Sequence, residues 1–200
     1  MVTASMRAKM KRIINKAMMD MGYIGVGTLE FLYSNGEFYF IEMNTRLQVE
    51  HTVTEEIYNI DLVKEQIKVA LGEKINIPVK ESYGHSIQCR INAENPITFA
   101  PSPGRIADYL PPGGHGVRID SALYPGYRIP VYYDSLIAKM ITHGKDRKEA
   151  IAKTLRSLDE YVITGIDTNI ELHKRIISSQ AFVEAKDISI KWLEEFLKES

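Results

Sequence analysis

A run of polar side chains at every second position is the part of this chain best suited to chemistry. In an extended strand, successive side chains point to opposite faces, so one face would carry the whole run while the apolar residues between pack inward. A strand with one solvated face has the same pattern and is the simpler interpretation. Against it, the upstream positions of the same parity are aromatic, as where a strand leaves the core and enters a cleft. The run is Glu42, Asn44, Arg46, Gln48 and Glu50, and the upstream aromatics are Phe38 and Phe40.

A further carboxylate, Glu30, lies in the preceding apolar segment, separated from Glu42 by the turn signal Ser34-Asn35-Gly36. A strict two-residue turn would pair Glu30 with Ile41 and put the two glutamates on opposite faces. A three-residue loop with a bulge at Gly36 pairs Glu30 with Phe40 and gives the glutamates one face, as diagonal neighbours about 7–8 Å apart. Carboxylates this close repel unless a cation lies between them, and their oxygens suit Mg²⁺. We therefore predict the three-residue loop.

The elements that would position these residues follow from periodicity and end signals. Clusters of strands followed by helices indicate an α+β fold. The polar connection 78–83 is the best candidate for a subdomain boundary. The predicted strands are 24–33, 37–45, 85–94, 116–121, 128–132 and 135–142. The predicted helices are 6–21, capped by Thr3 or Ser5, one capped by Thr54, one capped by Asp61, one each after Asp146 and Thr168, and a last one around Trp192.

Composition excludes several classes of protein. The 200 residues allow one large domain or two small ones, and the net charge of -1 favours neither nucleic acid nor an acidic membrane as a partner. The one cysteine, Cys89, cannot form an intrachain disulfide, which suits a cytoplasmic protein. No apolar run approaches the roughly 20 residues that span a bilayer.

Several motifs, taken together and in order, resemble those of biotin carboxylases, and the resemblance covers essentially the whole chain. They are Leu29-Glu30-Phe31, Glu42-Met43-Asn44-Thr45-Arg46, Gln48-Val49-Glu50-His51, Cys89-Arg90-Ile91-Asn92-Ala93-Glu94, Pro101-Ser102-Pro103-Gly104 and Tyr132-Tyr133-Asp134-Ser135. The resemblance implies an ATP-grasp ligase that carboxylates biotin with ATP and bicarbonate through carboxyphosphate. It implies the C-terminal portion of an ATP-grasp domain over residues 1–78. The antiparallel-sheet and helical biotin carboxylase C-terminal domain would occupy residues 79–200.

The resemblance also implies roles for single residues and for partners. Glu30, Glu42 and Asn44 would hold Mg²⁺ or Mn²⁺ against ATP. Arg46, Gln48 and the backbone of Val49 would bind bicarbonate, with Glu50 as general base and Arg90 stabilising the enolate-like form of biotin. The implied partners are a biotin carboxyl carrier, a carboxyltransferase and a second copy in a homodimer near Arg118, in the cytoplasm or a mitochondrial matrix.

Alternatives remain beside this interpretation. Arg90 alternates with polar neighbours and, by pattern alone, is a surface arginine, while Cys89 has the parity of a core residue. Another ATP-grasp ligase, such as a carbamoyl phosphate or purine-pathway synthetase, would share the acidic and asparagine ligands but not the stretch from Arg46 to His51 followed by Arg90. A non-catalytic module for dimerisation or carrier docking is a different class.

Two departures from the family bear on function. The chain lacks the N-terminal domain and glycine-rich lid of whole biotin carboxylases, so we predict that it neither hydrolyses ATP nor carboxylates biotin alone. Thr52 stands where many members have proline, which predicts a slightly looser chain after the catalytic run.

Overall fold

The computed structural model describes residues 3–75, 77, 81–186 and 188–198. Its contacts divide the chain into two compact units. We call Met1–His51 with Asp61–Val79 the hairpin unit, and Thr52–Ile60 with Lys80–Ser200 the sheet unit. The elements in chain order are α1 (Ala4–Met21), β1 (Thr28–Ser34), β2 (Glu37–Asn44), α2 (His51–Tyr58), α3 (Leu62–Ala70), β3 (His85–Asn92), β4 (Tyr109–Leu110), β5 (Val117–Ser121), β6 (Leu136–Gly144), α4 (Arg147–Glu160), β7 (Val162–Ile163), α5 (Ile170–Ser178), α6 (Gln180–Glu184) and α7 (Trp192–Lys198).

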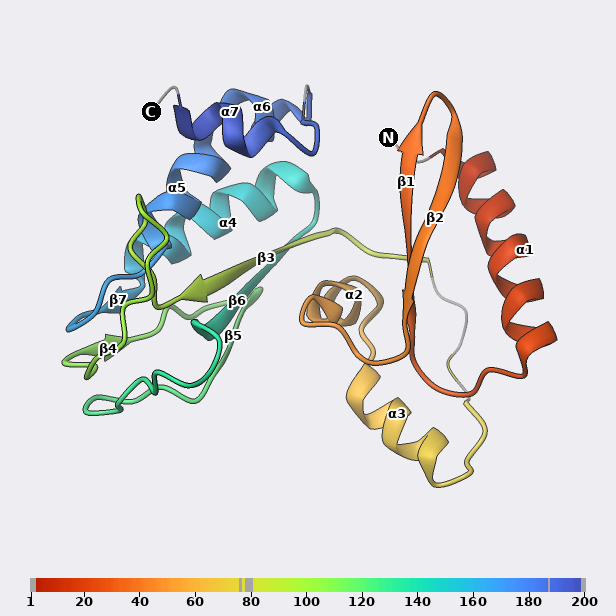
Figure 1. The fold of residues 1–200 in the computed structure, drawn as a ribbon, viewed down its shortest axis with the longest axis horizontal. Helices are drawn as coiled ribbons and strands as arrows, with labels where there is room; N and C mark the ends of the chain where they lie inside the picture. Colours follow the sequence, from red (N-terminus) through yellow and green to blue (C-terminus); the bar gives the residue numbers. More distant parts are fainter. Residues whose placement is uncertain (1–2, 76, 78–80, 187, 199–200) are drawn as a thin grey trace. The chain divides into compact units, whose positions relative to one another are not determined.

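The hairpin unit consists of the antiparallel β1–β2 pair with α1 and α3 (Figure 1). Helix α1 starts with a capping box, in which the Thr3 hydroxyl accepts from the backbone N–H of Met6, as the cap signal predicted. An ion pair of 3.6 Å between Lys9 and Glu37 connects α1 to the start of β2. Asp61 caps α3 by accepting from Lys64 N–H, again as predicted.

The sheet unit is built on the antiparallel sheet β3-β6-β5, with α4 packed along one of its faces (Figure 1). On one face, Cys89, Ile91 and Met140 pack against Leu158 of α4 and form the main core. This confirms Cys89 as a core residue, since only 1% of it is exposed. A small pair of β4 and β7 completes the strands of the described residues.

Side-chain hydrogen bonds connect α2 to the other face of this sheet. Thr52 Oγ1 donates to Gln88 Oε1 on β3, and Arg118 of β5 donates to Glu55 Oε2 at 2.8 Å. The backbone N–H of Tyr83 also donates to the carbonyl of Ile57 at 2.8 Å. The segment that follows the polar run Glu42 to Glu50 therefore folds as part of the sheet unit.

Three local predictions were wrong. Thr54 lies inside α2, because a turn from Gln48 starts that helix three residues earlier. Residues 128–132 form no strand and contribute only a bridge between Arg128 and Arg105. Helix α5 has its N-cap at Asn169, one residue after the predicted Thr168. The predicted boundary at 78–83 lies partly outside the described residues. Asp146, in contrast, caps α4 as predicted, accepting from Glu149 N–H at 2.9 Å.

Candidate active site

The β1–β2 hairpin brings Glu30 and Glu42 directly opposite each other. The turn is the two-residue Asn35-Gly36, with Ser34 paired to Glu37 and both turn residues at positive φ, 50° and 86°. The predicted three-residue loop is therefore wrong. A bulge inside the strand pair shifts the register instead, because Phe31 pairs with Phe40 while Glu30 pairs with Glu42. Ile41 is the extra residue. It puts the two glutamates on one face, as the longer loop was expected to do, but pairs them directly instead of diagonally.

The glutamates share one face, as predicted, because a single amide donates to both. Asn44 Nδ2 lies 2.9 Å from Glu30 Oε1 and 3.0 Å from Glu42 Oε1. Gln48 Nε2 donates to the same Glu30 oxygen at 2.8 Å. Like charges opposite each other in a strand pair are destabilising, and these two amides offset the repulsion. We call Glu30, Glu42, Asn44 and Gln48 the glutamate cluster.

After Asn44 the predicted extended run breaks. The chain bends at Arg46, turns at Val49-Glu50 and enters α2 at His51, so one strand face does not carry the whole run. Arg46 Nη1 donates to the carbonyl of Leu47 at 3.2 Å, and both Arg46 and Glu50 are exposed. The turn is held by His51, whose Nδ1 lies 2.6 Å from the Gln48 carbonyl. A carbonyl only accepts, so this ring nitrogen carries the proton.

The glutamate cluster fits a divalent cation that is shared with a phosphate ligand. Among the described residues, no three His, Cys, Asp or Glu side chains gather as a complete metal site. Mg²⁺, however, is usually held by one or two carboxylates, with waters and substrate phosphates completing its shell. The Asn44 amide nitrogen occupies the position between the carboxylates that a cation would take. Rotation of that amide would present its oxygen as a third ligand.

Arg90 lies on β3, in the sheet unit, and its side chain is exposed on the face opposite the core. It pairs with Lys139 of β6, and Lys139 pairs with Asp120 of β5, so a row of charges crosses the sheet. Lys139 Nζ lies 3.3 Å from Asp120. Burial alone would raise the pKa of Asp120, but Arg118 and Lys139 together hold it below its usual value. The carboxylate thus balances a cation beside Arg90.

The contacts that fix α2 to the sheet were not predicted from the sequence. Thr52 is fully buried, and its hydroxyl donates to Gln88, which holds this residue in the sheet unit. The looser chain expected from the missing proline stays a prediction. Arg118 binds Glu55 and Asp120, both at 2.8 Å, and Glu56 at 3.4 Å. The sequence did indicate that Gln88 lies on the same face of β3 as Arg90, because the two residues have the same parity. Only the fold shows that Gln88 contacts α2.

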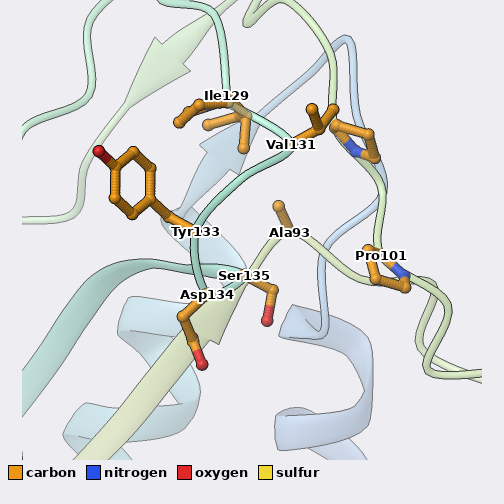
Figure 2. A pocket seen from close by; sticks show the side chains of 9 residues that line it. Ala93, Pro101, Ile129, Val131, Tyr133, Asp134 and Ser135 are labelled. Atoms are coloured by element: carbon orange, nitrogen blue, oxygen red, sulfur yellow. The ribbon is translucent and has the colours of Figure 1, made fainter.

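Three of the motifs quoted from the sequence meet beyond the end of β3, around a cavity of about 300 Å³ (Figure 2). Asp134 Oδ1 accepts from Leu136 N–H at 2.8 Å at the start of β6. Ser135 Oγ donates to Glu94, which also accepts from Asn92 at 3.2 Å. These polar contacts are structural connections between loops. The lining residues are Ala93, Pro101, Pro103, Ile129, Pro130, Val131, Tyr133, Asp134 and Ser135.

Comparison with known proteins assigns both parts of the chain. Residues 88–195 match the model of the biotin carboxylase C-terminal domain, and residues 1–77 match the carbamoyl-phosphate synthase L chain, ATP binding domain. The chain belongs to the biotin carboxylase family. It is 51% identical over 184 residues to the biotin carboxylase of Pseudomonas aeruginosa, covering 91% of this chain and 41% of that protein. It is 52% identical over 198 residues to biotin carboxylase 1 of Bacillus subtilis, covering 96% of this chain and 44% of that protein.

A solved structure of the family has the same fold. The biotin carboxylase domain of the Hydrogenobacter thermophilus 2-oxoglutarate carboxylase, a dimer with MgADP, ADP and bicarbonate, superposes with a TM-score of 0.93. Identity is 42%, over 97% of this chain and 44% of that one. The likeness confirms the predicted α+β fold, an ATP-grasp part followed by the biotin carboxylase C-terminal part. The chain spans less than half the length of these relatives. Among the described residues, no helix has the length and apolar character needed to cross a bilayer.

Proposed function

We propose that this chain is part of a biotin carboxylase, a ligase that carboxylates biotin with ATP and bicarbonate. The glutamate cluster carries the proposal, because its paired carboxylates and shared amide form half of a Mg–phosphate site. Family membership supports it, since the cluster occurs in a chain that matches both family models in order. By themselves, the 200 residues are expected to be inactive, since the relatives are more than twice as long.

Glu30, Glu42 and Asn44 would hold Mg²⁺, or Mn²⁺, against the phosphates of ATP. When bound, the ion neutralises phosphate charge and orients the terminal phosphoryl group. Gln48 Nε2 donates at 2.8 Å to the same Glu30 Oε1 that accepts from Asn44. Two amide donors on one oxygen fix the direction of that carboxylate before any ligand arrives.

Glu50 is proposed as the general base, with Arg46, Gln48 and the backbone of Val49 binding bicarbonate. The bicarbonate hydroxyl gives its proton to Glu50, and the resulting oxygen attacks the γ-phosphorus of ATP. The bond from that phosphorus to the leaving ADP oxygen breaks, so the products are carboxyphosphate and ADP. Arg46 is a permanent cation with planar donors, suited to the negative charge on the carboxylate oxygens.

Arg90 is proposed to act on the second half of the reaction. Carboxyphosphate breaks down to carbon dioxide and phosphate, and the ureido nitrogen of biotin then attacks the carbon dioxide. The released phosphate accepts the proton of that nitrogen, and as the proton leaves, negative charge develops on the ureido oxygen, which gains enolate character. A guanidinium beside that oxygen stabilises the charge as it forms. This step needs Arg90 in a fixed position, because misplaced donors lose most of their catalytic effect.

The wider setting is part of the same proposal. Residues 1–78 would be the C-terminal portion of an ATP-grasp domain and residues 79–200 the biotin carboxylase C-terminal domain. The partners would be a biotin carboxyl carrier, a carboxyltransferase component and a second copy of the enzyme. A cytoplasmic location is supported by the single cysteine, Cys89, which is buried in the core and leaves no disulfide to form.

A chimera tests the proposal, with this chain replacing the matching segment of the Pseudomonas aeruginosa enzyme. We expect ATP cleavage that requires bicarbonate and is stimulated by free biotin. Glu50→Gln should lower bicarbonate-dependent cleavage by roughly 100-fold, the low end of general-base contributions. Glu37→Gln is the matched control, since that carboxylate of β2 contacts Lys9 and lies outside the glutamate cluster. An inactive chimera beside an active parent enzyme, or full activity of Glu50→Gln, would contradict the proposal.

A further inference from the structure

Strand β3, which carries Arg90, is an edge strand. The sheet order β3-β6-β5 leaves one side of β3 without a neighbouring strand among the described residues. The backbone groups on such an edge need other partners if they are buried. Those at Arg90 and Asn92 find them in the segment that starts α5, more than seventy residues later in the chain.

One side chain, that of Asn169, replaces the missing strand. Its Nδ2 donates to the carbonyl of Arg90 at 3.0 Å, and its Oδ1 accepts from the N–H of Asn92 at 2.9 Å. Its own backbone N–H donates to the carbonyl of Asn92 at 3.3 Å. An asparagine amide has the donor and acceptor of a peptide group, so it can pair with a strand edge as another strand would.

Asn169 makes these bonds instead of the local one that its position favours. It is the N-cap residue of α5, where an asparagine normally accepts from the first turn of its own helix. No such side-chain bond is present, and Asn169 is 9% exposed. The tertiary contact with β3 therefore sets the orientation of the Asn169 side chain, in place of the local capping bond that its position favours.

A second donor reaches the same carbonyl from the next turn of the helix. His173 Nε2 lies 2.8 Å from the Arg90 oxygen. Because a carbonyl only accepts, this nitrogen carries a proton, and both lone pairs of the Arg90 carbonyl are then used. On the core side, Ile91 is fully buried and fixes the following residue. The peptide group after Arg90 is therefore held by two donors at the edge and by the core beneath.

We propose that Asn169 and His173 are positioning residues for Arg90, holding the peptide from which the guanidinium extends toward biotin. The inference rests on the proposed function, since it matters only if Arg90 meets biotin. Neither residue touches substrate in this scheme. Their effect passes through the backbone, which sets the starting point and direction of the long Arg90 side chain.

The Pseudomonas aeruginosa chimera, assayed with free biotin, tests the inference. Asn169→Ala removes both side-chain bonds, and Asn169→Asp keeps the acceptor but sets an oxygen against the Arg90 carbonyl. We expect either variant, and His173→Ala, to lower kcat/KM for biotin by about tenfold, as a small misplacement would. His173→Gln keeps a side-chain donor and should therefore keep most of the kcat/KM for biotin that His173→Ala loses. Bicarbonate-dependent ATP cleavage without biotin should stay unchanged in all of them.

Ile177→Val is the control for packing, because Ile177 is buried on the same helix and makes no bond to Arg90. If the Asn169 and His173 variants lose ATP cleavage and biotin turnover together, with their stability, the residues only dock α5 and the inference fails. A chimera without biotin-dependent turnover would overturn the proposed function instead. Should Asn169→Ala not fold, the His173→Ala and His173→Gln pair decides, since both leave Asn169 in place.

Discussion

The hairpin unit and the sheet unit bury their side chains to very different extents. In the sheet unit, Ile91, Met140 and Leu158 are fully buried around one core. In the described part of the hairpin unit no residue is buried, and Phe40 is 59% exposed. Yet the hairpin unit carries the glutamate cluster and the proposed base. The proposed chemistry is thus concentrated where the described part of the chain has the least core of its own.

Rigidity has a different source in each unit. A polar face that binds a cation and phosphate cannot also be packed core, so local bonds must hold it. In the hairpin unit those bonds are the amides of Asn44 and Gln48 and the turn at His51. In the sheet unit, Arg90 extends from β3, whose alternate residues are buried in the core. Packing therefore holds the strand that carries Arg90. Stability should therefore differ sharply between the units.

The largest expected effect is in the main core. Leu158→Ala should lower the unfolding free energy of the sheet unit by about 2–5 kcal/mol, because it leaves a cavity. Phe40→Ala removes the edge-to-face pair with Phe31, whose ring centroids lie 5.8 Å apart. It should cost less, about 0.5–1.5 kcal/mol for the aromatic pair plus the small area that the half-exposed ring buries. Native-state hydrogen exchange measures both, amide by amide. Equal losses would mean that the two units share one core.

A smaller effect tests whether α2 belongs to the sheet unit. Thr52→Val keeps the shape but removes the hydroxyl, leaving Gln88 without its bond at a buried site. Loss of such a partner costs about 1–3 kcal/mol. We expect hydrogen exchange to accelerate in α2 and β3 while β1 and β2 stay unchanged. Thr52→Ser, which keeps the hydroxyl, is the control, and an equal loss in β1 and β2 would contradict the assignment.

Local signals predicted the parts of both units that depend only on neighbouring residues. Asp61 and Asp146 cap helices because a short acceptor before an apolar period needs no distant partner. Cys89 was placed in the core by parity alone. The shared face of Glu30 and Glu42 was also predicted, although by the wrong device, since the extra residue is Ile41 within the strand rather than a third loop residue.

The rest depended on partners that lie far apart in the sequence. No local signal tells that Thr52 meets Gln88, or that Asn169 pairs with the edge of β3 instead of capping its own helix. The run from Glu42 to Glu50 failed as a strand beyond Asn44 for a related reason. The alternation of polar and apolar side chains does not reveal backbone hydrogen bonds. The turn at Gln48 depends on such a bond and on the ring of His51, so the pattern could not predict it.

The pH dependence of the unfolding free energy should also differ between the units, because His85 lies in the sheet unit. Burial, and then the charge of Arg147, lowers its pKa below the ordinary 6.5. Below pH 6.5 the unfolded chain then binds more protons than the folded one, so unfolding free energy falls as pH falls. Urea unfolding followed by Trp192 fluorescence, from pH 8 to 5, should show this loss. Burial also lowers the pKa of His173 in the same unit, so His85→Gln should reduce the slope without abolishing it. An unchanged slope would exclude His85 as a source.

The smallest effect concerns the glutamate cluster itself. Asn44→Ala removes the donor shared by Glu30 and Glu42, so two opposed carboxylates should destabilise the β1–β2 pair by about 0.2–1 kcal/mol. Hydrogen exchange of the hairpin amides measures the loss. Because the cause is repulsion between partly exposed charges, 1 M salt should reverse it. A second change, Glu42→Gln, should restore stability as well, by removing one charge. If neither reverses the loss, Asn44 stabilises the hairpin by packing, and the cluster is not electrostatically poised for a cation.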